Sequence, residues 1–187
     1  RIEAALQDPS AAAASCVVAF RLHAAELVMQ AQGSESTNRL VARVARMVEN
    51  ALAASRGWAS AWRVECSAVC RTADDELAVF MRSRVSGDQL LGTARTVLDS
   101  VATVSARPDS EYVPALSAGI AFLEGDVTGA DLLLQNAHVA VAQATEPQAC
   151  ATYSSVAQEQ SRRRLSLQSS LRGAIERGEM WLAFQPQ

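Results

Sequence analysis

The stretch Cys70-Arg71-Thr72-Ala73-Asp74-Asp75-Glu76-Leu77-Ala78-Val79-Phe80 predicts a strand, a tight turn and a second strand. The arm before the turn (62–71) alternates with a two-residue period, and the arm after it (77–81) is a short apolar run. Between the arms lie three successive carboxylates, which repel one another unless a cation, a basic residue or water compensates. The turn is therefore either a solvated acidic loop or the remnant of a site that held metal and phosphate.

The composition is that of an ordered globular protein, with 49% hydrophobic and 20% charged residues. A chain of 187 residues accommodates one domain and a short extension. The net charge of -3 gives no electrostatic reason to bind nucleic acid. No stretch is long and apolar enough to span a membrane. From the charge and from this absence, we expect neither nucleic acid nor a membrane as a partner of this chain. The 17 residues counted as lysine or arginine are all arginine, which leaves no lysine for phosphate binding or base chemistry.

The four cysteines lack the spacing of a metal site, and we predict no metal ligand among them. Cys66 and Cys70 lie four residues apart in a predicted strand, so alternation places both on one face as buried small apolar residues. Free cysteines fit a reducing compartment. We therefore expect a cytoplasmic protein, or the cytoplasmic part of a larger sensor.

Hydrophobic periodicity predicts the element order β-α-α-β-β-α-β-α-β. This order predicts an α+β fold, with helices on the faces of a ferredoxin-like or palm-like, mostly antiparallel sheet of about five strands. A connector helix should follow, with Leu167, Leu171 and Ile175 four residues apart as a dimer-forming or docking seam. The expected elements are strands at 16–22, 62–71, 77–81, 112–122 and 149–153, and helices at 24–32, 38–55, from 86–88 onward, at 127–144 and at 156–177. On the helix at 127–144, the predicted inward residues are Leu132, Leu133, Ala137, Ala140 and Val141.

This ordered set resembles a GGDEF domain, the diguanylate cyclase module of bacterial cyclic-di-GMP signalling. The hairpin acids, the run Ser117-Ala118-Gly119-Ile120-Ala121 and the helix that starts near Asp131 carry the resemblance. The tail from Leu171 to Glu179, with Phe184-Gln185-Pro186-Gln187, resembles the opening of an EAL phosphodiesterase domain. The resemblance implies a degenerate GGDEF domain at 1–154, a connector helix at 155–178 and the first residues of an EAL domain at 179–187.

The signature hairpin reads Ala73-Asp74-Asp75-Glu76-Leu77 where the family has Gly-Gly-Asp/Glu-Glu-Phe. The acids at its third and fourth positions survive as Asp75 and Glu76. The glycines, which adopt positive φ and let a triphosphate approach the backbone, are lost. Asp74 tolerates such a turn but adds negative charge where phosphates would lie, and Ala73 supplies no polarity.

The other family positions are also altered. Arg21 occupies the position at which the family has a metal-binding Asp. Arginine cannot ligate Mg²⁺ and would repel it. The next acidic position is His23, and the family's lysine is replaced by Glu26. Met29 and Asn38 stand at the guanine-binding Asn and Asp. We therefore identify Arg21, His23, Met29 and Asn38 as degenerate metal and guanine positions.

The phosphate-neutralising and product-binding positions have lost their charges too. The family's Lys and Arg on the later helix fall on Thr145 and Ala149. Its inhibitory Arg-x-x-Asp would require Arg at Val64 and Asp at Ser67. Arg63 is one residue out of register, which on a strand places it on the opposite face.

A structural hypothesis follows from the replacement at Arg21. Arg21 and His23 project from the same face of the first strand, which should lie beside the hairpin. The Arg21 guanidinium would then replace the lost cation and pair with Asp75 or Glu76. His23 and His138 lie in unrelated elements, so we expect structural or surface roles rather than a metal or acid–base pair.

We expect a catalytically inactive regulatory or interaction module that modulates its own C-terminal EAL domain, with Asp75 and Glu76 vestigial. No cofactor or metal is expected; Mg²⁺ and GTP would matter only if residual binding survived. Two alternatives remain: an active diguanylate cyclase with an atypical metal site, and a passive scaffold or dimerisation domain of an EAL phosphodiesterase. A homodimer and partner signalling proteins are further expected partners. The fragment itself should be inactive, whereas its parent is a candidate cyclic-di-GMP phosphodiesterase.

Overall fold

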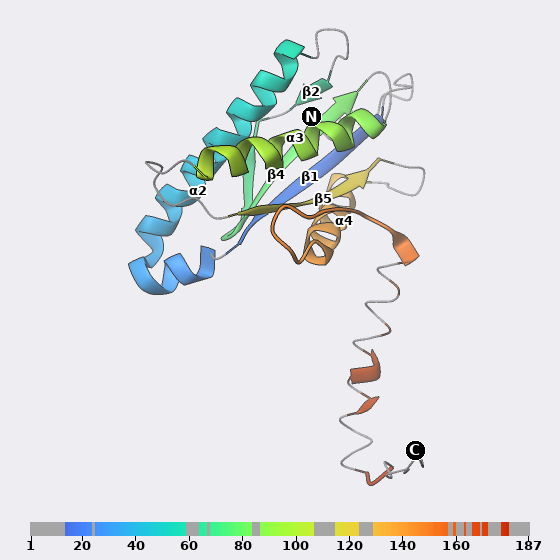
Figure 1. Cartoon of the computed structure of the whole chain (residues 1–187). Helices are drawn as coiled ribbons and strands as arrows, with labels where there is room; N and C mark the ends of the chain where they lie inside the picture. The colour runs from blue at the N-terminus through green and yellow to red at the C-terminus, as the bar shows by residue number, and fades with distance from the viewer. Residues whose placement is uncertain are drawn as a thin grey trace, which may run out of the picture. The chain divides into compact units, whose positions relative to one another are not determined.

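The computed structural model describes residues 14–23, 25–58, 64–66, 68–83, 87–106, 115–123 and 129–156, and 159, 163, 166–168, 170–171 and 177–179 beyond them. The chain divides into two units, Arg1–Tyr153 and Ser154–Gln187. The first unit is an α+β domain built on one sheet (Figure 1). The predicted fold class is confirmed.

The sheet has β1 in its middle and the order β2-β4-β1-β5-β6, with β3 also paired to β4. All its pairings are antiparallel except that of β5 with β6. Its strands are β1 (Ala14–Leu22), β2 (Val64–Cys66), β3 (Cys70–Ala73), β4 (Glu76–Ser83), β5 (Leu116–Phe122) and β6 (Cys150–Thr152).

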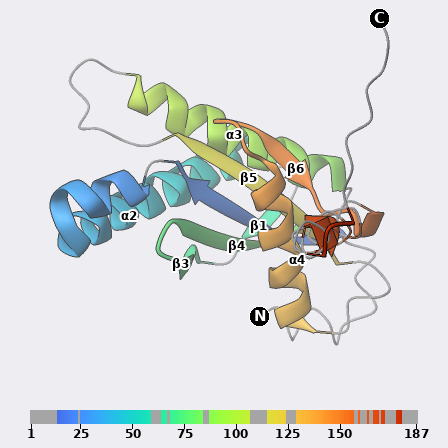
Figure 2. The same cartoon turned by 90° about the horizontal axis from the view of Figure 1, so that it is seen from below.

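Helices cover both faces of the sheet (Figures 1 and 2). They are α2 (Ala25–Trp58), α3 (Gly87–Ser105) and α4 (Ala130–Gln143). Because side chains of a strand alternate, β1 contributes to two cores. Val18 and Phe20 belong to the cluster that α2 and α3 cover, and Val17 and Ala19 to the cluster that α4 covers. The face of β1 on which a residue lies therefore decides which helix it meets.

The two helices expected at 24–32 and 38–55 both lie in α2 and meet at a kink at Gly33, and the residues between Gly33 and Asn38 are helical. The helix is broken only at Gly33, whose φ of 79° and ψ of 176° lie outside the helical region. Glycine reaches this positive φ without steric cost. Thr37 Oγ1 donates a hydrogen bond to Gly33 O at 3.1 Å, which ties the second half of α2 to the break.

The first hairpin arm forms two strands, so the sheet has six strands rather than about five. Cys66 pairs with Met81 and Cys70 with Ala78, which leaves one extra residue on the first arm between these pairs. An extra residue reverses the alternation of faces. Cys66 and Val69 accordingly pack against the core, whereas Cys70 is exposed. The prediction that Cys70 is buried beside Cys66 was therefore wrong.

Helix α4 packs on the sheet largely as its periodicity predicts. Leu133, Ala137, Ala140 and Val141 are buried. Leu132, predicted to point inward, is 38% exposed. The polar Asn136 is buried on that face instead, at the helical spacing of three from Leu133.

The backbone of α4 approaches β5 closely at Gly119. A Cβ built on Gly119 would lie 2.0 Å from Val141 N and 2.7 Å from Ala137 O. Backbone atoms cannot yield as a flexible side chain does, so only glycine permits this approach. The approach sets the distance between α4 and the end of the sheet that carries the signature turn.

The second unit contains helical residues at 155–156, 159, 163, 166–168 and 170–171, within the predicted connector helix. Leu167 and Leu171 of the predicted seam are 63% and 50% exposed. No helix among the described residues is long and apolar enough to cross a membrane. The domain boundaries stay predictions. Several predicted features lie outside the described residues: Arg63, Ser67, Ile175, the start of the strand expected at 112–122 and the EAL-like residues from 180 to 187.

Candidate functional site

Arg21 lies beside the signature turn on the α4-facing side of the sheet. It is the register partner of Glu76 across the β1–β4 pairing, and Leu22 N donates to Asp75 O at 2.8 Å. Its Nε lies 3.7 Å from Asp75 Oδ2, and its Nη2 lies 3.7 Å from Glu76 Oε1. The predicted pairing of Arg21 with the signature acids is confirmed, and it involves both of them.

Glu76 has a second partner that the sequence did not reveal. His138, on α4, places Nδ1 2.9 Å from Glu76 Oε2 and 3.1 Å from Oε1. Glu76 is only 5% exposed, whereas the side chain of His138 is 32% exposed. A buried carboxylate requires such partners because its desolvation is otherwise uncompensated. The only sequence signal was the position of His138 directly after the buried Ala137, at the edge of the face of α4 that meets the sheet.

Two polar atoms near the contacts of Arg21 with the acids make no hydrogen bond with a described residue. They are Arg21 Nε and Ser117 Oγ, and Ser117 is the register partner of Arg21 on β5. Contacts of 3.7 Å are too long for hydrogen bonds, so Arg21 acts on the two acids through its charge. His23, at the second degenerate metal position, is half-buried, and its backbone N donates to Ala115 O at 2.9 Å.

These residues do not fit a divalent metal. Mg²⁺ requires near-octahedral oxygen ligands at about 2.0–2.1 Å. Here a guanidinium lies within 3.7 Å of both signature carboxylates and supplies positive charge of its own. No group of three or more His, Cys, Asp or Glu residues suited to a metal occurs in the described part of the chain. The guanidinium of Arg21 therefore supplies positive charge next to both carboxylates.

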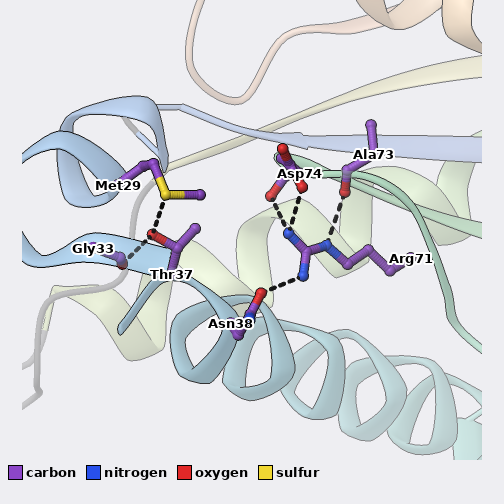
Figure 3. Close-up of polar contacts among 7 residues, drawn as sticks. All are labelled: Met29, Gly33, Thr37, Asn38, Arg71, Ala73 and Asp74. Carbon is purple, nitrogen blue, oxygen red and sulfur yellow. Dashed lines mark hydrogen bonds and ion pairs between the residues drawn. The ribbon is translucent and has the colours of Figure 1, made fainter. Parts of the chain in front are cut away.

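A second arginine lies on the α2-facing side of the turn (Figure 3). Arg71, on β3, donates from Nε to Ala73 O at 3.0 Å and from Nη2 to Asp74 O and Oδ1 at 3.2 and 3.0 Å. Its Nη1 donates to Asn38 Oδ1 at 2.6 Å. The side-chain oxygen of Asn38, at one of the predicted guanine positions, therefore already accepts a hydrogen bond. Nothing in the sequence pattern pointed to Arg71 beyond its place directly before the turn.

The other guanine position is engaged within α2 (Figure 3). Thr37 Oγ1 lies 3.9 Å from Met29 Sδ in a weak hydrogen bond. Met29 and Asn38 thus lie on either side of the break at Gly33. A thioether is a weak acceptor and cannot replace the amide of asparagine in reading a base edge.

The turn itself is built without left-handed residues. Gln148 is the only non-glycine residue with positive φ in the described part of the chain, so Ala73, Asp74 and Asp75 all have negative φ. The register shift between Arg71 and Ala73 takes up the irregularity instead. The turn therefore does not use the backbone freedom that two glycines would give it.

The loop after α4 carries Thr145 and Ala149, the two positions predicted to correspond to the family's phosphate-neutralising Lys and Arg. It is held by backbone hydrogen bonds, from Gln148 N to Leu116 O at 2.7 Å and from Ala118 N to Ala149 O at 2.9 Å. Neither position offers a cation. Val64, predicted to stand at the position of the family's inhibitory Arg, lies in β2 and pairs with Ser83.

Sequence comparison gives no match to a protein-family model and none to a curated protein. Solved structures do match. The GGDEF domain of YfiN from Pseudomonas aeruginosa has 20% identity and a TM-score of 0.67, over 87% of this chain and 90% of that one. An EAL/GGDEF domain protein from M. capsulatus has 18% identity and a TM-score of 0.63, over 82% and 94%. This chain has the fold of a GGDEF domain.

The active GGEEF domain of a diguanylate cyclase from Vibrio cholerae has the same fold, with 13% identity and a TM-score of 0.56, over 76% of this chain and 83% of that one. At such identities the likeness concerns the GGDEF fold alone.

Proposed function

We propose that the chain is a catalytically inactive GGDEF-type module of cyclic-di-GMP signalling that acts by regulation or interaction. The observation that carries the proposal is Arg21, which pairs with Asp75 and Glu76 at the position of a metal ligand. Transfer of a phosphoryl or nucleotidyl group needs a metal or a comparable clamp on the phosphates. A guanidinium held by two carboxylates of the chain neither ligates a metal nor faces a phosphate.

The α2-facing side of the turn supports the same conclusion. Arg71 uses the acceptor of Asn38 and fixes the carbonyls of Ala73 and Asp74. A guanine edge presents two donors that need acceptors free to receive them. GTP would have to displace Arg71 and then find only an uncharged amide.

The module is proposed to act on its own C-terminal EAL domain, whose opening the sequence at 171–187 resembles. A protein that carries both domain names, from M. capsulatus, has the same fold as this chain, which supports the pairing. Inactivity of the GGDEF-type domain would leave it free to change as a regulatory surface, since no substrate geometry has to be preserved.

The test is product formation by the purified chain. Incubated with GTP and either Mg²⁺ or Mn²⁺, it should form no cyclic-di-GMP, while an active GGEEF domain assayed in parallel should. The variant Arg21→Asp should also stay inactive, because the guanine and phosphate positions remain altered. Metal-dependent formation of cyclic-di-GMP by the unaltered chain would refute the proposal and favour an atypical metal site.

A passive dimerisation role is the second candidate, and the exposed pair Leu167 and Leu171 favours it. Apolar residues four apart on a helix form one stripe that a second helix can cover. Sedimentation equilibrium should then give a dimer for the unaltered chain and a monomer for the Leu167→Gln, Leu171→Gln variant. A monomer in both cases would remove this candidate and leave the regulatory one untouched.

A further inference from the structure

Helix α2 bears a hollow that belongs neither to the signature turn nor to the positions around it. Its volume is about 550 Å³, within the range of roughly 300–1,000 Å³ typical of small-molecule sites. Neither Asn38 nor Arg71 is among its described lining residues, which all come from α2: Val28, Gln32, Ser36, Arg39, Leu40, Ala42, Arg43 and Arg46.

The break at Gly33 kinks α2 within the segment that lines the hollow. Val28 and Gln32 precede the break, and the other lining residues follow it. A Cβ on Gly33 would meet nothing within 4 Å, so space does not require glycine there. The φ of 79° does, because side chains other than glycine rarely adopt it.

The lining is strongly basic. It contains three arginines and, among its described members, no carboxylate. Arg39 pairs with Glu35 at 2.9 Å and also donates to Ser36 Oγ, but its side chain is 70% exposed and that of Glu35 85% exposed. Arg46 is exposed and makes no ion pair or hydrogen bond with another described residue. Arg43 has a partner within the protein and adds its charge to the wall.

The hollow also has an apolar side. Leu40 is buried in the core beneath it, and Val28 packs against the same core. An anion that carried only charge would use the guanidinium groups and leave this side uncovered. Phosphate attached to an organic group would use both.

We propose that the hollow on α2 binds a phosphorylated small molecule. Guanidinium groups match phosphate oxygens with two parallel hydrogen bonds, which favours phosphate over a smaller or less charged anion. Arg39 and Arg46 supply these donors, and the half-buried Val28 contacts the organic part. The inference rests on α2 alone and holds whether or not the signature turn is inactive.

Calorimetric titration with pyrophosphate and with ATP, without added metal, tests the proposal. Both probes should bind the unaltered chain. The double variant Arg39→Ala, Arg46→Ala should weaken both by about tenfold or more, since a charged hydrogen bond contributes roughly 1.5–3 kcal/mol and 1.4 kcal/mol is tenfold. Glu35→Gln removes the carboxylate that competes for Arg39, so it should tighten binding about two- to threefold.

Two controls locate the site. Arg177→Ala removes an exposed arginine that is paired with Glu179 at 2.7 Å, and should leave binding unchanged. Arg95→Ala, which removes an exposed arginine of α3, should do the same. Three outcomes would overturn the proposal. They are absence of binding by both probes, equal binding by the double variant, and loss of binding on Asn38→Ala alone. Circular dichroism confirms that the variants keep their helix, and Arg39→Lys, Arg46→Lys should retain part of the affinity.

Co-sedimentation with lipid vesicles distinguishes a soluble phosphorylated ligand from a lipid headgroup. Phosphatidylcholine vesicles with added phosphatidylglycerol present phosphate as a lipid headgroup, whereas the calorimetric probes are soluble. We expect the chain to remain in the supernatant while it binds ATP. Sedimentation that depends on Arg39 and Arg46, with no binding of ATP, would contradict a soluble ligand.

Discussion

The signature turn has an arginine on each side, and the two differ in what they replace. On the α4-facing side, Arg21 stands in a strand and meets two carboxylates, one of them buried. On the α2-facing side, Arg71 stands at the turn and meets two backbone carbonyls and two side-chain oxygens, one of them from Asn38 on α2.

If the module is inactive, as we propose, the two arginines contribute in different ways. Arg21 places a positive charge of the chain itself beside Asp75 and Glu76, where a metal ion would need those carboxylates as ligands. Arg71 is held by hydrogen bonds at the surface, and its 34% exposed side chain can rotate away at modest cost. Metal binding would therefore need a substitution at Arg21, whereas on the other side displacement of Arg71 is only the first step.

The largest expected loss of stability comes from a substitution that displaces α4 and so disturbs only the α4-facing side of the turn. Gly119→Ala should lower the free energy of unfolding by about 3 kcal/mol, because the added Cβ collides with the backbone of α4. It should also break the contact of His138 with Glu76 and leave Arg71 undisturbed. Urea unfolding measures the stability. Gly92→Ala in α3, where a Cβ meets nothing within 4 Å, should be neutral or slightly stabilising; equal losses in both variants would contradict the close packing.

Removal of the buried acid is the next test. Glu76→Ala should cost about 2 kcal/mol, because Arg21 and His138 lose their shared partner, although their partial exposure to water limits the loss. Asp75→Asn is the matched control and should cost less than about 1 kcal/mol, since the Asp75 side chain is 43% exposed. If Asp75 proved the more costly position in thermal unfolding, Glu76 would not be the centre of the α4-facing side.

Arg71→Ala should cost about 1 kcal/mol, the net contribution of its exposed hydrogen bonds. The stronger readout is local: backbone amides near the turn should exchange faster with deuterium, while those of β1 stay protected. Arg71→Lys should not restore protection, because an ammonium group lacks the planar fork that reaches several acceptors at once. Unchanged exchange in Arg71→Ala would show that the turn does not depend on this residue.

The smallest effect is expected at Asp74. Its side chain is 87% exposed, so Asp74→Ala should change the free energy of unfolding by no more than about 0.5 kcal/mol despite the 3.0 Å ion pair with Arg71. Chemical denaturation in low and high salt measures the change. A loss as large as that of Arg71→Ala would mean that the ion pair, rather than the carbonyl contacts, holds the arginine.

The sequence predicted contacts that depend on strand geometry, and it missed contacts that depend on how helices pack on the sheet. The pairing of Arg21 with the acids followed from strand alternation and from the expected adjacency of two strands, and both are properties of the backbone. The contacts of Arg71 with Asn38 and of His138 with Glu76 depend on how α2 and α4 pack on the sheet, which no periodicity specifies. Cys70 was misplaced because one extra residue in the first hairpin arm reverses the faces, and nothing in its residue types marks that position.

The most direct test of the account is the binding of Mn²⁺, followed by electron paramagnetic resonance, in the unaltered chain and in Arg21→Asp. If Arg21 has replaced the metal, the unaltered chain binds no Mn²⁺ at the turn, while Arg21→Asp gains a site that Glu76→Gln abolishes. If the unaltered chain binds Mn²⁺ as tightly as Arg21→Asp, and Glu76→Gln abolishes that binding, the arginine has not taken the place of the cation and the account is wrong.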